Sequence, residues 1–347
     1  MSQLFSRDLR NRLIGFYGLL GCFNLGAWIW AFLAFHDEPI LLGTAFLAYS
    51  FGLRHAVDAD HIAAIDNVTR KLMQEGKRPL SVGFFFSLGH STIVVFASLV
   101  VFLTATLVAT QFDAIKSIGA TIGTSISAFF LIAIAWINIV ILRGVWQTFQ
   151  KVRKGGTYTD QTPDMLVGGG VMARLFRPLF RMITRPCHMY PIGLLFGLGF
   201  DTATEVALLG VSAAAAAKGL SVVAMAVFPI LFTAGMTLVD TTDGMLMVGA
   251  YGWAFMKPIR KLYYNLTITF MSVIVALMVG VIEAGGLLKD QLYLTGGFWD
   301  FVGGLNDNFG TLGFVIIGVF VLTWIGSLVI YRIKGFQQFE STTAAPD

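Results

Sequence analysis

The chain is poor in cysteine and in charge. Its two cysteines, Cys22 and Cys187, are too few for a disulfide framework and form no thiolate metal-site pattern. Charged residues make up 13% of the 347 residues, whereas hydrophobic residues make up 56%. This balance disfavours a soluble domain and is typical of a polytopic membrane protein.

Motifs for nucleotide hydrolysis and for zinc-dependent proteolysis are also missing. The sequence has no Walker A pattern, so direct use of ATP is disfavoured and no ATPase subunit is indicated. It has no H-E-x-x-H motif and no nucleophile and base constellation, which disfavours an enzyme. The formal charge of +4 could suggest nucleic acid, but the position of the basic residues matters more than their sum. We expect no nucleic-acid partner.

Apolar runs long enough to cross a bilayer recur along the whole chain. They predict an all-α polytopic membrane protein with eight transmembrane helices. The first run is too long for the core of a signal peptide, so we expect it to be retained as a span. The predicted spans are 13–35, 40–67, 80–109, 118–142, 190–217, 220–250, 262–287 and 310–331.

Lysine and arginine are sorted between the two sides of this predicted bundle. If both termini are cytoplasmic, only Lys116, Lys218 and Lys289 face outward, and the other basic residues, apart from Arg54 within the second span, lie on the inner side. The positive-inside rule therefore favours a multi-pass protein of the cell membrane, surrounded by lipid, with both termini cytoplasmic.

The chain divides into two halves joined by a polar segment. Residues 1–142 hold transmembrane helices 1–4, residues 143–190 form a glycine-containing basic linker in the cytoplasm, and residues 191–347 hold helices 5–8. The simplest role for this basic linker is contact with lipid headgroups.

Two short patterns recur in the second half at nearly the same offset. Phe51-Gly52-Leu53 returns as Phe196-Gly197-Leu198, and Phe86-x-x-Gly89 returns as Phe232-x-x-Gly235. Helices 2–4 would then correspond to helices 5–7. Because each unit has an odd number of helices, the two units would have opposite orientations, as in inverted-repeat transporters that bind substrate near the midplane.

The second span contains the ionisable stretch Arg54-His55-Ala56-Val57-Asp58-Ala59-Asp60-His61. Unpaired, its Arg and two Asp residues would cost on the order of 8–10 kcal/mol at the centre of a membrane. A self-neutralising pair of Arg54 and Asp58, at i and i+4, would account for only two charges. Two imidazoles and two carboxylates form a plausible first shell for a divalent metal of intermediate softness, so His55, Asp58, Asp60 and His61 are candidate ligands.

A regular helix cannot direct all four side chains at one ion. With 3.6 residues per turn, His55, Asp58 and His61 spread over about 120° of one side, and Asp60 points away. Either Asp60 pairs elsewhere, for instance with Arg54 or the third span, or Gly52 marks a local break in the helix.

Other ionisable residues occur inside the predicted spans. His90, beside Gly89 in the third span, is a fifth candidate ligand, since glycine permits close helix approach. Asp201 and Glu205 share a helix face in the fifth span and could extend the shell or carry protons, or simply bond nearby threonines. Asp240 in the sixth span could likewise extend the shell or carry protons, or it could lie near the cytoplasmic end of that span.

Four stretches resemble the nickel/cobalt transporter family of secondary permeases: RHAVDADHIAAIDN at 54–67, FFFSLGHSTIVV at 84–95, LGFDTATEVALL at 198–209 and GMTLVDTTDG at 235–244. The resemblance implies high-affinity uptake of Ni²⁺ or Co²⁺ as substrate, with no cofactor, by an eight-span permease. It also implies that His55, Asp58, Asp60 and His61 are central to metal recognition. The alternatives are a metal efflux permease, whose His-rich loop is not matched by the single His188 of the linker, and an intramembrane metalloenzyme.

Overall fold

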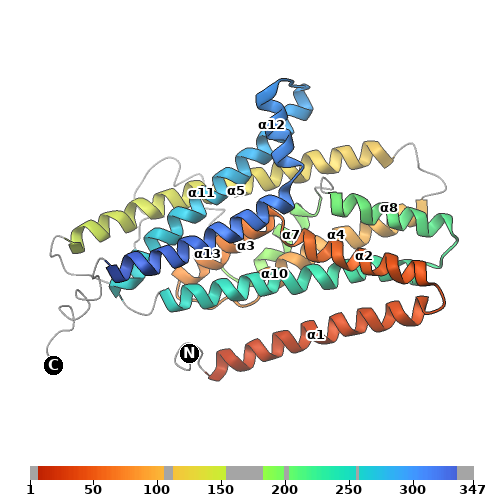
Figure 1. The fold of residues 1–347 in the computed structure, drawn as a ribbon, viewed down its shortest axis with the longest axis horizontal. Coiled ribbons are helices and arrows are strands. Elements are labelled where there is room, and N and C mark those ends of the chain that lie inside the picture. Colours follow the sequence, from red (N-terminus) through yellow and green to blue (C-terminus); the bar gives the residue numbers. More distant parts are fainter. Residues whose placement is uncertain (1–6, 105–111, 154–182, 199–202, 255–257, 334–347) are drawn as a thin grey trace.

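The protein is a bundle of long helices (Figure 1). A computed structural model describes residues 7–104, 112–153, 183–198, 203–254 and 258–333, and these ranges contain helices and turns but no strand. The helices are α1 (Arg7–Phe35), α2 (Pro39–His55), α3 (Ala59–Gln74), α4 (Val82–Thr104), α5 (Phe112–Arg153), the short 3₁₀ helix η2 (Pro186–His188), α7 (Met189–Phe196), α8 (Ala203–Ala217), α9 (Val222–Met225), α10 (Val227–Ala254), α11 (Pro258–Leu292), α12 (Gly297–Asn306) and α13 (Phe309–Ile333).

The helices confirm an all-α membrane protein. In the described ranges, five helices are long and apolar enough to span a bilayer, and up to seven spans result if each of two bent helix pairs counts as one. The bent pairs are α2 with α3, at 51°, and α12 with α13, at 79°. The predicted span 190–217 corresponds to α7 and α8, neither of which is long enough alone. The count of eight therefore stays a prediction.

The first and last described helices place both ends of the chain at the same end of the bundle. In Figure 1, α1 begins and α13 ends at the same end of the bundle, and α2 and α8 run in opposite directions along it. The basic residues Lys71, Lys77 and Arg78 lie at or just beyond the last turn of α3, and we refer to that end as the basic end. Its assignment to the cytoplasm remains a prediction from charge.

Helices extend into both ends of the segment predicted as a linker, residues 143–190. α5 runs on to Arg153, and helical structure resumes at Pro186. Residues 154–182 lie outside the described residues. The two halves also pack across one another: α2 lies against α10, α4 against α7, and α5 against α11. They form one interlocked bundle.

Glycines allow these crossing helices to touch backbone to backbone. A Cβ atom on Gly52 of α2 would lie less than 3.0 Å from the Phe232 carbonyl of α10, and one on Gly193 of α7 would lie equally close to the Phe86 carbonyl of α4. Such distances are essentially never seen for a real Cβ atom. Only glycine therefore fits at these crossings.

The contacts are reciprocal, which is the pattern that an inverted repeat predicts. Gly235 of α10 approaches the carbonyl of Tyr49 on α2, and Gly89 of α4 approaches the carbonyl of Tyr190 on α7. The register differs from the one expected from sequence, however. By its contacts Gly52 corresponds to Gly193, and not to Gly197, so the equivalent stretches begin at Tyr49 and Tyr190, four residues from the predicted alignment.

We predict that Gly193→Ala destabilises the bundle by about 1–3 kcal/mol, the usual cost of overpacking a close contact. The matched control is Gly26→Ala on α1, where an added Cβ meets nothing within 4 Å. Both changes raise helix propensity equally, so the difference isolates the crossing. Thermal unfolding in detergent measures it, and equal melting temperatures for the two variants would contradict the close contact.

Candidate metal site

The centre of the site is a break in the second span. α2 ends at His55, and α3 begins at Ala59 after a bend of 51°. Asp58 takes the extended backbone conformation of an N-cap residue, with φ −65° and ψ 148°. The break therefore falls inside the ionisable stretch, and not at Gly52, which is buried within α2. It removes the constraint that a regular helix placed on the side chains.

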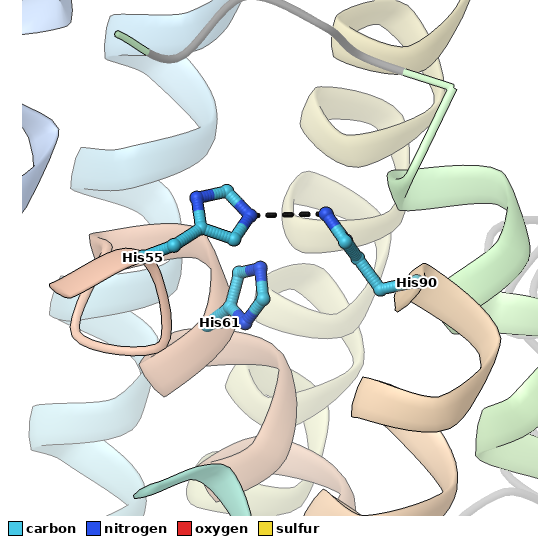
Figure 2. Close-up of side chains that lie close together, drawn as sticks. All are labelled: His55, His61 and His90. Atoms are coloured by element: carbon cyan, nitrogen blue, oxygen red, sulfur yellow. Dashed lines mark hydrogen bonds between the residues drawn. The ribbon is translucent and has the colours of Figure 1, made fainter. Parts of the chain in front are cut away.

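Three imidazoles converge at this break (Figure 2). His55 comes from the end of α2, His61 from the first turn of α3 and His90 from α4, and each offers a nitrogen within 4.8 Å of the others. All three are at most 2% exposed. The closest pair is His55 Nε2 and His90 Nε2, at 2.9 Å. The structure thus brings three of the five candidate ligands together.

Glu205 joins this group from the first turn of α8. Its Oε1 lies 2.9 Å from His90 Nε2 and 3.8 Å from His55 Nε2. The carboxylate is buried, with 1% of the residue exposed. The sequence placed Glu205 in a supporting or coupling role, whereas the structure places its oxygen as close to the imidazole nitrogens as they are to one another.

Two further carboxylates hold the Nδ1 atoms of His55 and His61. Asp58 Oδ2 lies 3.0 Å from His55 Nδ1, and the Asp240 oxygens lie 3.2 and 3.3 Å from His61 Nδ1. A carboxylate at Nδ1 favours the tautomer with its proton there and leaves Nε2 as a lone-pair donor. His61 Nε2 is buried and has no hydrogen-bond partner among the described residues, which leaves that lone pair available.

The remaining predicted residues lie at the margin of the site. Asp60 is partly buried in the first turn of α3, and its charge acts on His55 and His61. Arg54 is exposed, and no ion pair joins it to Asp58 in the described part of the chain. The self-neutralising pair is therefore not formed. Asp201 lies outside the described residues.

Sequence reasoning missed the side chains that surround the imidazoles. Phe86 packs edge-on against His61, with ring centroids 4.8 Å apart, and Phe232 lies 5.5 Å from His55. Thr204 Oγ1 is 3.3 Å from His55 Nδ1. The two phenylalanines occupy matching places in the recurring Phe-x-x-Gly pattern, a signal that identified the repeat but not their role as walls of the site.

The profile of the NicO family, described as high-affinity nickel-transport protein, matches residues 41–330. This range includes every candidate ligand. The chain belongs to the high-affinity nickel-transport family. Resemblance to that family, expected from four short stretches, is confirmed across most of the sequence.

Relatives support this membership over nearly the full length of the family fold. The chain is 58% identical to a high-affinity nickel transport protein of Cupriavidus necator, over 95% of both chains. It is 51% identical to the hydrogenase nickel incorporation protein HupN of Bradyrhizobium diazoefficiens, over 91% of this chain and 83% of the relative. It is 40% identical to the cobalt transport protein NhlF of Rhodococcus rhodochrous, over 85% and 84%. No solved structure matches.

We predict that Asp240→Asn weakens Ni²⁺ binding about 10- to 100-fold, because the carboxylate that orients His61 loses its charge. Isothermal titration of the purified protein measures the dissociation constant. Asp300→Asn on α12, where the aspartate is exposed, is the matched control. An unchanged dissociation constant for Asp240→Asn would remove Asp240 from the site.

Proposed function

We propose that this protein takes up Ni²⁺, Co²⁺ or both across the cell membrane with high affinity, and that His55, His61 and His90 bind the ion near the midplane. The observation that carries the proposal is the convergence of three buried imidazoles at a broken transmembrane helix. Inverted-repeat transporters place their substrate at such breaks, where freed backbone lines the site.

The spacing of the nitrogen atoms suits one coordinated ion. Two nitrogen ligands about 2.1 Å from the same ion and at right angles to one another lie about 3 Å apart. The His55 and His90 Nε2 atoms, at 2.9 Å, fit this arrangement, and Glu205 Oε1 lies within reach of the same position. Imidazole donors favour Ni²⁺ and Co²⁺ over Mg²⁺ and Ca²⁺, which prefer oxygen ligands alone.

The helix ends around the site favour the binding of a cation. The carboxylates of Asp58, Asp60 and Glu205 lie at the N-termini of α3 and α8, where the helix dipole stabilises negative charge. The carbonyl end of α2 terminates at His55, and its partial negative charge favours a cation. The ionised carboxylates then offset the charge of the bound ion.

Relatives favour this reading over its alternatives. Those described above are named for nickel or cobalt transport or nickel incorporation, and they give no support to the efflux reading. A family of transport proteins also favours transport over catalysis.

Cells that express the protein should accumulate radiolabelled Ni²⁺, and excess Co²⁺ should suppress this uptake whereas excess Mg²⁺ should have little effect. His55→Ala and His61→Ala should each abolish uptake at normal membrane expression, because the imidazole nitrogens distinguish this site from one for hard cations. His36→Ala, in the exposed turn after α1, is the matched control. Normal uptake by His55→Ala or His61→Ala would remove that residue from the ligand set.

Acid should inhibit Ni²⁺ binding. Metal ligation requires a neutral imidazole, so protons compete with the ion as the pH falls through the ordinary titration range of histidine, near pH 6.5. We expect the dissociation constant to rise steadily between about pH 7.5 and pH 5.5. Equilibrium binding to the purified protein measures this, and a flat affinity over that range would argue against a histidine-containing shell.

A further inference from the structure

A second buried polar cluster lies along α3, beyond the histidines. Asp66 accepts hydrogen bonds from Tyr251 of α10 and, at 2.6 Å, from Ser272 of α11. Arg70, one turn further along α3, donates to Thr269 of α11 at 3.2 Å and to Asn67 at 3.0 Å. Asn138 of α5 completes the group by donating to Asn67 at 2.5 Å. We call these seven residues the α3 network.

The α3 network is unusual for a membrane interior. Asp66 and Arg70 are both 0% exposed, and their opposite charges act on one another. Charged side chains in transmembrane helices are costly and generally mark a functional element. The transport site described above uses neither residue, so the network requires an explanation of its own.

The network lies between the histidines and the basic end of the bundle. α3 and α10 run side by side in the same direction, because His61 pairs with Asp240, Ile65 contacts Gly244 and Asp66 pairs with Tyr251. Successive contacts therefore lead from the metal site toward the last turn of α3. Any ion that leaves the histidines along α3 in that direction reaches Asp66 and Arg70.

A carboxylate lies between the two polar groups. Asp243 of α10 interacts electrostatically with Asp240 on one side and with Asp66 on the other. One of its buried oxygens has no hydrogen-bond partner among the described residues. Acidic side chains thus continue from the histidine cluster to the network, after which the positive charge of Arg70 opposes the passage of a cation.

The network also ties the two halves of the chain together. Its members on α3 and α5 come from the first half, and those on α10 and α11 come from the second. Alternating access moves one half of an inverted-repeat transporter relative to the other around the binding site. Such a movement would separate Asp66 from Tyr251 and Ser272, because these hydrogen bonds join opposite halves.

We propose that the α3 network is the gate that closes the cation path between the histidine cluster and the basic end of the bundle. This inference rests on the transport function proposed above. In this proposal the hydrogen bonds from Arg70 to Thr269 and Asn67 hold the guanidinium across the path, and their rupture opens the path to the basic end in each cycle.

The test uses a reporter cysteine behind the gate. Ile65, fully buried and one turn from His61, contacts Gly244 between Asp240 and Tyr251. Ile65→Cys is introduced in a chain whose exposed Cys22 and Cys187 are replaced by serine. A membrane-impermeant cationic methanethiosulfonate is added to inside-out vesicles, which expose the predicted basic side, and to intact cells. The rate of modification is then measured.

Tyr251→Phe removes one hydrogen bond to Asp66 and should raise the rate of modification in inside-out vesicles about tenfold, equivalent to about 1.4 kcal/mol in the opening equilibrium. Tyr49→Phe is the matched control, since its hydroxyl bonds Asn24 at 3.0 Å outside the network. It should leave the rate unchanged. Ser272→Ala removes the other bond to Asp66 and serves as the second variant should Tyr251→Phe fail to fold.

Unchanged modification rates in Tyr251→Phe and Ser272→Ala, accompanied by lower melting temperatures, would show that the network only stabilises the fold. Equal acceleration in Tyr49→Phe would also overturn the gate, because the effect would then not depend on the network. Faster modification from intact cells alone would place the gate on the opposite side and contradict the proposed path. The labelling uses no nickel, so its outcome is independent of the uptake assay.

Discussion

Polar side chains inside a bilayer need partners within the protein, and the structure around the histidines depends on this requirement. Each of the three imidazoles faces a carboxylate: Asp58 at His55, Asp240 at His61 and Glu205 at His90. The imidazoles and their carboxylate partners come from five helices, α2, α3, α4, α8 and α10, which must approach closely enough to exclude lipid. The glycine contacts that bring α2 onto α10 and α4 onto α7 therefore support the proposed metal site as well as the fold.

A break in the helix resolves a conflict between helical geometry and metal coordination. A regular helix would leave His55 and His61 nearly two turns apart along its axis. The bend between α2 and α3 brings their ring centroids to 4.6 Å. Gly313 of α13 packs against the carbonyl of Val57, in the break itself, where any side chain would collide. An irregular backbone segment inside the membrane thus lies against protein, as the absence of water there requires.

Much of this arrangement could be predicted from sequence, because it is local. Long apolar runs predicted the helices, and the cost of burying charge singled out the stretch from Arg54 to His61. The position of the break was not predicted, and its packing against Gly313 of α13 involves a helix that is remote in sequence. The register of the repeat was wrong for a similar reason. The short match aligned Gly52 with Gly197, and the equivalence of Gly52 and Gly193 follows only from the contact of Gly193 with Phe86 in the structure.

The role of Asp240 shows the limit of reading one helix at a time. From sequence, Asp240 could lie in the site or near the end of its span, and the pairing with His61 depends on α3 and α10 running side by side. The same pairing carries Asp243 and Tyr251 toward Asp66. Residues that seemed to be a local acidic cluster on α10 thus form one side of an interface whose other side is α3.

α3 links the two polar regions mechanically. It begins directly after the break and carries His61 in its first turn and Asp66 and Arg70 in the following turns. The chain is helical throughout between these residues. A change in the bend between α2 and α3 therefore alters the distance from His55 to His61 and, through the same rigid helix, displaces Asp66 from Tyr251 and Ser272. If the two proposals above hold, affinity for the ion and closure of the path to the basic end depend on the same bend. An ion that draws the imidazoles together would then act on the proposed gate without touching it, because both depend on the orientation of α3.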